Sequence, residues 1–118
     1  MRILHVLDRS LPIVAGYTTR TAAIVGQEAA LGLDPVALTG VRQGASAGGL
    51  IDGVRHLRTA SPALATRCAG APLLGVAAEM TALGRRIVEA HREAPVDLVH
   101  AHSPVLCGLP ALAAVRVV

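Results

Sequence analysis

The sequence has no lysine, no phenylalanine and no tryptophan, and only one tyrosine among its 118 residues. Without lysine it contains no P-loop, which requires G-x-x-x-x-G-K-[ST]. Aromatic side chains are too scarce to stack nucleic-acid bases, and the 11 basic residues, all arginine, are scattered, so nucleic acid is not expected as a partner. With 53% hydrophobic and 16% charged residues, the chain is still expected to fold around an aliphatic core as a single domain.

Cysteine and long apolar runs are also scarce. The two cysteines, Cys68 and Cys107, form no C-x-x-C pair, so the sequence predicts free thiols in a reducing compartment rather than disulfides. No window approaches the roughly 18 apolar residues of a membrane span, and Asp8 and Arg9 interrupt the N-terminal apolar run, unlike a signal peptide. These absences predict a cytoplasmic protein and are compatible with association with a membrane surface.

What is present alternates between strand and helix patterns. Short runs typical of β-strands lie at residues 3–7, 36–39, 54–58 and 97–101. Helical patterns run from 17 or 18 to about 31, from 72 to 94, and from about 105 onward. The glycine-rich segment 40–53 is expected to be a loop. His5, inside the first apolar run, is interpreted as a hydrogen-bonded histidine at the edge of burial.

The helical segments carry boundary signals and apolar stripes. Thr18 is expected to be the N-cap of the first helix and Gly32 its C-terminal glycine, while Pro72 fits the first position of the second helix. The inward residues expected for the first helix are Ile24, Val25 and Leu31. Those expected for the second are Leu73, Val76, Ala77, Met80, Leu83, Ile87 and Val88.

The element order β-α-β-β-α-β-α predicts an α/β fold with a Rossmann-like, doubly wound parallel sheet of strand order 3-2-1-4. The winding of such a sheet reverses between its first and fourth strands. The loops that follow these two strands, residues 8–16 and 102–104, are therefore expected to face each other across one crevice at the carboxyl edge of the sheet.

Candidate binding groups lie in these two loops. Gly16 precedes a helix whose first N–H groups can hold a phosphate or a sugar hydroxyl, although the G-x-G-x-x-G fingerprint of a dinucleotide site is missing. Arg20 either reaches an anion from the first helical turn or is an ordinary surface arginine. His100 and His102 share one side of their strand if it extends that far, and His102 is the better candidate to bind a sugar hydroxyl. An H-x-H pair without a third ligand nearby in sequence does not predict a metal site, and Ser103 is also interpreted as a cap.

Three segments resemble a known family: MRILHVLDRSLP..AGYTTRT, EAALGLDPVALT and DLVHAHSPVLCGLPALAA. They resemble the N-terminal domain of family 4 glycosyltransferases with the GT-B fold, and within it the exosortase-associated enzymes of bacterial exopolysaccharide clusters. The resemblance implies retaining, metal-independent transfer from a nucleotide-sugar to a glycan or lipid-linked acceptor. It implies no catalytic residue and no cofactor in this chain. The substrate-binding set expected on this basis is Gly16 near the donor diphosphate, with Tyr17, Arg20, His100, His102 and Ser103.

The family pattern extends beyond this sequence, because its second domain binds the donor through an acidic E-x7-E motif that is not found here. Residues 1–118 are therefore expected to be one truncated, acceptor-side domain that is inactive alone, and its uncovered apolar surface is expected to favour self-association. Two alternatives remain. One is a non-catalytic Rossmann-like module that binds a partner through an exposed sheet edge. The other is half of a nucleotide-binding oxidoreductase, which the missing glycine fingerprint disfavours.

Overall fold

The computed structural model describes residues 1–44, 46–63 and 70–118. Cys107 is a free, buried thiol, whereas Cys68 lies outside the described residues. Within the described part, no helix is both long and apolar enough to cross a membrane. The elements in chain order are β1 (Arg2–Leu7), α1 (Gly16–Ala30), β2 (Asp34–Thr39), the short helical turn η1 (Val41–Gln43), β3 (Gly49–Ile51), β4 (Val54–Arg58), α3 (Pro72–Glu93), β5 (Leu98–Ala101) and α4 (Gly108–Val115).

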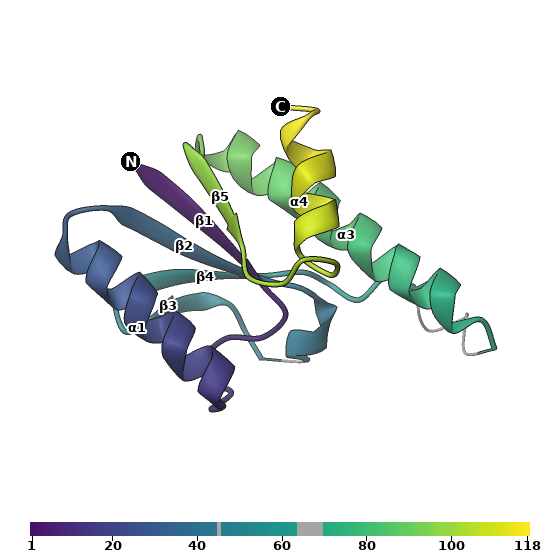
Figure 1. The fold of residues 1–118 in the computed structure, drawn as a ribbon, viewed down its shortest axis with the longest axis horizontal. Helices are drawn as coiled ribbons and strands as arrows, with labels where there is room; N and C mark the ends of the chain where they lie inside the picture. The colour runs from purple at the N-terminus through teal and green to yellow at the C-terminus, as the bar shows by residue number, and fades with distance from the viewer. Residues whose placement is uncertain (45, 64–69) are drawn as a thin grey trace.

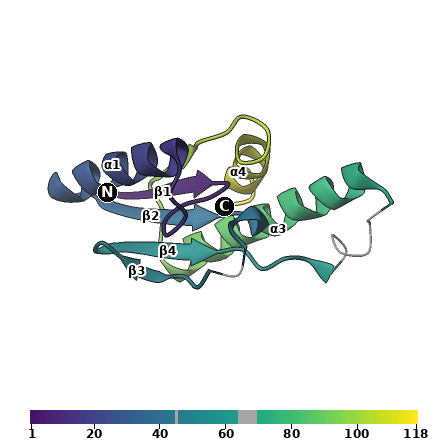
Figure 2. The same ribbon diagram turned by 90° about the horizontal axis from the view of Figure 1, so that it is seen from below.

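The strands form one sheet in the order β3-β4-β2-β1-β5 (Figures 1 and 2). β1 pairs in parallel with β2 on one side and with β5 on the other, and β2 pairs in parallel with β4. The fold class is therefore α/β, and the predicted order of the four parallel strands is confirmed. This arrangement is compatible with a Rossmann-like fold.

The sheet is mixed rather than wholly parallel, because β3 runs antiparallel to β4. The expectation of a plain loop over residues 40–53 is wrong, since this segment contains η1 and β3. A two-residue turn joins β3 to β4, and its residues Asp52 and Gly53 have positive φ angles of 50° and 78°. Asp-Gly is a favoured pair for such a hairpin turn, so the sequence does carry a signal for this hairpin.

Helices cover both faces of the sheet, with α1 on one face and α3 and α4 on the other (Figure 1). Successive strand residues point to opposite faces, so Leu4 and Val6 of β1 and Leu38 of β2 pack toward Leu83 and Ile87 of α3. The same core includes three buried residues from the last part of the chain: Cys107, Ala111 and Ala114. The core on this face is aliphatic, as the composition predicts.

Helix α1 begins earlier than expected, with Gly16 as its first residue. Thr18 is therefore inside the first turn and is not the N-cap. Its hydroxyl accepts a hydrogen bond from the Ala15 N–H at 2.8 Å and donates one to the Ala15 carbonyl at 2.9 Å. At the other end Gly32 has a φ of 79°, which confirms the predicted C-terminal glycine.

The face that α1 buries also differs from the expected stripe. Its buried residues are Thr18, Thr21 and Val25. Ile24 and Leu31, expected to point inward, lie at the surface, and Leu31 is 78% exposed. Thr21 can be buried because its hydroxyl donates to the Tyr17 carbonyl at 3.0 Å, so this hydroxyl is not left unsatisfied.

Helix α3 begins with Pro72 at its first position, as predicted. Its C-terminal half packs on the sheet through Leu83, Ile87 and Ala90, whereas its N-terminal half extends beyond the strand ends (Figures 1 and 2). The expectation that Leu73 faces the core is therefore wrong, because Leu73 is 84% exposed. Periodicity identified the helix but not how much of it the sheet covers.

Replacing Ile87 by alanine is expected to lower the free energy of unfolding by about 2–4 kcal/mol, because the buried Ile87 would leave a cavity against the sheet. Leu73→Ala is the matched control, since Leu73 lies at the surface, and its effect should stay within about 0.5 kcal/mol. Urea denaturation measures both variants. Equal losses would contradict the described packing of α3.

Candidate functional site

The two loops expected to form a site do meet at the carboxyl edge of the sheet. β1 and β5 pair in parallel, with His5 opposite His100, and the His102 N–H donates to the Val6 carbonyl at 3.0 Å just beyond β5. The ring of Tyr17, in the first turn of α1, lies edge-on to the His102 ring with centroids 6.3 Å apart. The switch point between β1 and β5 thus brings the start of α1 next to the H-A-H segment.

Three histidines cluster at this point, and His5 is the one that the sequence did not assign to the site. His5 Nδ1 lies 2.9 Å from His102 Nε2, and His5 Nε2 lies 2.6 Å from Glu28 Oε2 on α1. The rings of His100 and His102 stack with centroids 4.2 Å apart. His5 is fully buried, His102 is partly buried and His100 is exposed, so the cluster opens to solvent on the β5 side.

The hydrogen bonds of His5 determine which ring nitrogens carry protons. A carboxylate only accepts hydrogen bonds, so His5 donates its Nε2–H to Glu28, and its Nδ1 is then an acceptor for the Nε2–H of His102. Burial lowers the pKa of His5 despite Glu28. Burial, together with neighbouring His100, His5 and Arg20, lowers the pKa of His102 to about 4. Both rings are therefore neutral near pH 7, and Nδ1 of His102 has no hydrogen-bond partner among the residues that the structure describes.

Two other polar groups near this edge of the sheet stay protonated. Burial raises the pKa of the Tyr17 hydroxyl to about 12, and this hydroxyl is buried without a hydrogen-bond partner among the described residues. Burial also raises the pKa of the Cys107 thiol to about 11, and Sγ lies 3.6 Å from Asp8 Oδ1. A neutral thiol is a poor nucleophile, so these groups shape the site without being reactive.

The remaining expected residues have different surroundings. Gly16 is exposed, and a Cβ built on it would meet no atom within 4 Å, so open space lies in front of the start of α1. Arg20 is exposed one turn later. Ser103 has a structural role: its hydroxyl accepts from the Cys107 N–H at 3.2 Å, and its carbonyl accepts from the Gly108 N–H at 2.8 Å. These bonds hold the turn that precedes α4, whose N-cap position is Cys107, so Ser103 is not the N-cap of that helix.

A second network, which the sequence did not reveal, holds the loop between β1 and α1. The Ser10 N–H donates to Gln43 Oε1 at 2.7 Å, and the Ser10 hydroxyl lies 3.1 Å from His56 Nδ1. Arg58, at the end of β4, donates to Ser10 Oγ at 2.8 Å and to the Leu11 carbonyl at 2.7 Å. β4 therefore anchors the loop that leads to Gly16.

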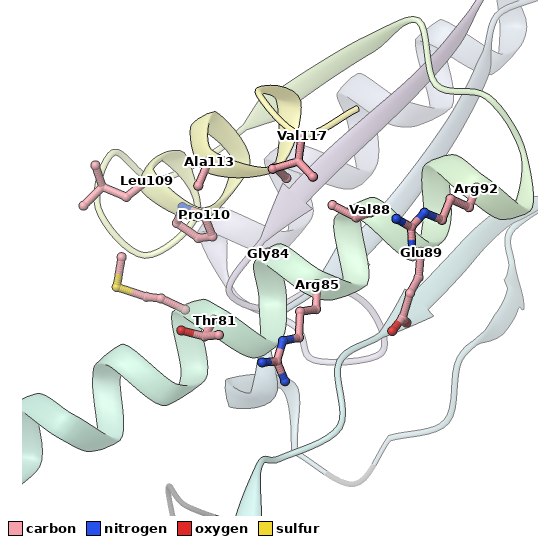
Figure 3. Close-up of a pocket in the computed structure, with 12 residues that line it drawn as sticks. Thr81, Gly84, Arg85, Val88, Glu89, Arg92, Leu109, Pro110, Ala113 and Val117 are labelled. Carbon is pink, nitrogen blue, oxygen red and sulfur yellow. The ribbon is translucent and has the colours of Figure 1, made fainter.

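A separate groove of about 740 Å³ lies between α3 and α4 (Figure 3). Its floor is apolar, with Gly84 and Val88 on α3 facing Pro110 and Ala113 on α4, and Val117 lies just beyond α4. Its rim carries the polar side chains of Thr81, Arg85, Glu89 and Arg92. The six residues expected to bind substrate do not line this groove, so it is distinct from the edge site.

The depressed pKa of His102 predicts a loss of stability in acid. The unfolded chain binds a proton at a histidine near pH 6.5, whereas folded His102 resists protonation until about pH 4. The stability that neutral His102 contributes to the folded state is therefore fully present above pH 6.5 and is lost as the pH falls toward 4. Urea midpoints measured at pH 7, 5.5 and 4.5 with a chelator present should fall with pH, and His102→Gln should reduce this fall without abolishing it, because the pKa values of His5 and His56 are also lowered by burial. An unchanged fall in His102→Gln would contradict the assignment.

Comparison with known proteins gives no family for this chain. No family model matches the sequence, and neither a curated protein nor a solved structure matches it significantly. The function therefore has to be inferred from the residues of the chain and their arrangement.

Proposed function

We propose that this chain is the acceptor-side, Rossmann-like domain of a retaining GT-B glycosyltransferase of family 4. The complete enzyme would transfer a sugar from a nucleotide-sugar to a glycan or lipid-linked acceptor in exopolysaccharide synthesis. The observation that carries the proposal is the meeting of the first turn of α1 with the H-A-H segment at the switch point, where Tyr17 lies against His102. Ligands of open α/β sheets bind at such a point.

The start of α1 supplies the features of an anion site on one side of the crevice. The first N–H groups of a helix have no acceptor within the helix, and the helix dipole places partial positive charge there. Gly16 leaves this end open, and Arg20 adds a full positive charge one turn later. These features suit the diphosphate of a nucleotide-sugar, whose other contacts would come from a donor-binding domain.

The histidines supply hydrogen-bonding groups for sugar hydroxyls on the other side. The sequence of contacts from Glu28 through His5 to His102 leaves His102 Nδ1 as an acceptor, and the exposed His100 ring lies stacked beside it. A nitrogen with a pKa of about 4 accepts a hydrogen bond but is a weak base at neutral pH. We therefore assign His102 to acceptor binding and not to proton abstraction.

The proposal includes a cytoplasmic location for the enzyme. Cys107 is a free thiol in the described part of the chain, which is typical of proteins kept in a reducing compartment. A cytoplasmic enzyme with access to nucleotide-sugars fits this property.

Titration with oligosaccharides tests the acceptor assignment on the chain itself. Amide resonances of residues 100–103 should shift in heteronuclear NMR spectra recorded with a chelator present. His102→Ala should raise the Kd about fivefold to tenfold, the effect of losing one hydrogen bond of about 1–1.5 kcal/mol. Arg85→Gln, on the rim of the α3–α4 groove, is the matched control and should leave the Kd unchanged. Shifts confined to the groove would refute the assignment.

A second candidate is a non-catalytic module that binds another protein chain. β5 is an edge strand of the described sheet, and its residue Leu98 is 49% exposed. The apolar groove between α3 and α4 lies on the helices that cover one face of this sheet. An unpaired strand edge and an apolar groove together invite association.

Light scattering coupled to size exclusion distinguishes this candidate. If the groove drives self-association, wild-type chain should give a mass above that of the monomer that falls with dilution, and Ala113→Asp should restore the monomer. His100→Ala, at the edge site, should leave the mass unchanged. A monomer at all concentrations would remove the support for self-association through this face.

A further inference from the structure

We infer that His5, His100 and His102 form a binding site for one divalent transition-metal ion, with Zn²⁺ as the expected ion. One ligand nitrogen from each of the three rings lies within 4.8 Å of the others. Three imidazoles with an open fourth position are a common zinc ligand set. This site goes beyond the proposed glycosyltransferase function, which needs no metal.

The sheet builds this ligand set from two distant parts of the chain. His5 and His100 are register partners on adjacent parallel strands, so their side chains leave the sheet on the same face. His102 follows two residues after His100 and returns to the same side. The H-A-H pair lacks a third ligand nearby in the sequence, but pairing of β5 with β1 brings His5 to it.

Glu28 orients the ring of His5 through a hydrogen bond of the kind found at zinc sites. Histidines that bind a metal almost always donate their other ring N–H to a carboxylate, carbonyl or water. Glu28 Oε2 lies 2.6 Å from His5 Nε2, and the opposite nitrogen, Nδ1, points to His102. The His5 ring is thus oriented by α1, with its free lone pair directed into the cluster.

The rearrangement needed for binding is small. Zn–N bonds of about 2.0–2.1 Å at tetrahedral angles place ligand nitrogens about 3.3 Å apart. The His5 and His102 nitrogens, now 2.9 Å apart, would separate by a few tenths of an ångström, and the exposed His100 ring would turn toward them. On binding, His102 would change tautomer, with its proton moving from Nε2 to Nδ1, so that the ion could bind His5 Nδ1 and His102 Nε2 while both rings stay neutral. A water would complete the coordination from the solvent side.

The chemistry of the donors selects the class of ion. Mg²⁺ and Ca²⁺ take oxygen ligands, whereas neutral imidazole nitrogens suit Zn²⁺, Cu²⁺ and Ni²⁺. Because all three donors are nitrogens, the site should bind Zn²⁺ and leave Mg²⁺ unbound. The positive charge of Arg20 near His102 disfavours any cation, and the negative charge of Glu28 beside His5 offsets this effect.

Competition with a chromogenic zinc chelator tests the site on metal-free protein at pH 7.5. The parent protein for these tests carries Cys68→Ser, which removes the thiol of Cys68 as an alternative zinc ligand, and every variant is made in this parent. The chain should bind one Zn²⁺ with a micromolar or lower Kd and should not bind Mg²⁺. The double variant His100→Ala/His102→Ala should lose this binding, and both side chains reach the surface, so folding should be retained. His91→Gln, a histidine on α3, is the matched control and should bind as the parent does.

Glu28→Gln and Co²⁺ test the geometry. Removing the carboxylate that orients His5 should weaken Zn²⁺ binding about 10–100-fold without removing a ligand. Co²⁺ should give the strong visible bands of tetrahedral coordination with the parent and not with the double variant. Zn²⁺ should also raise the Tm of the parent by several degrees and leave that of the double variant unchanged.

Two results would overturn the inference. One is Zn²⁺ binding in the double variant that equals binding in the parent, and the other is a parent Kd for Zn²⁺ that is weaker than micromolar. These measurements use no sugar ligand. Their failure would therefore leave the oligosaccharide titration, which is performed with a chelator present, as an independent test of the proposed function.

Discussion

The parallel pairing of β1 with β5 is the constraint on which the edge site depends. β1 lies between β2 and β5, and the crossover through α3 returns the chain to the far side of β1. This pairing sets His5 beside His100 and ends with the hydrogen bond from His102 to Val6. Because parallel strands finish at one edge, the loop before α1 and the H-A-H segment come together there. His5 and His102, which meet there, are 97 residues apart in sequence.

The chemistry at this edge favours binding over reaction. Burial keeps the Tyr17 phenol and the Cys107 thiol protonated, and it keeps His102 neutral. What remains available is a set of hydrogen-bonding lone pairs and donors, with the positive end of α1 beside them. Such a set can recognise hydroxyl groups and phosphates, and its three imidazole nitrogens can hold a transition-metal ion. Neither role requires a nucleophile.

The sequence predicted the strand order and the meeting of the two loops because both follow from topology. The sequence-based predictions were wrong for features that depend on how side chains pack against one another. The stripe chosen for α1 ranked Ile24 and Leu31 by hydropathy, but threonines with satisfied hydroxyls fill the interface. The Asp52-Gly53 turn was a local signal that the surrounding glycines obscured. His5 is hydrogen-bonded, as predicted, but it is fully buried and not at the edge of burial. Its partner Glu28 and its neighbour His102 depend on how α1 and β5 pack, which no local pattern encodes.

The two ends of α1 hold the histidines in different ways, and this has a mechanical consequence. The first turn places Tyr17 against His102, and the last turn places Glu28 against His5. Since α1 buries little apolar surface, these polar and aromatic contacts do much to fix its axial position on the sheet. A rigid helix cannot follow two rings that move apart, so a ligand or ion that separated them widely would have to break the contact at one end of α1. Binding at the strand edge is therefore restricted to occupants that leave the spacing of the two rings nearly unchanged.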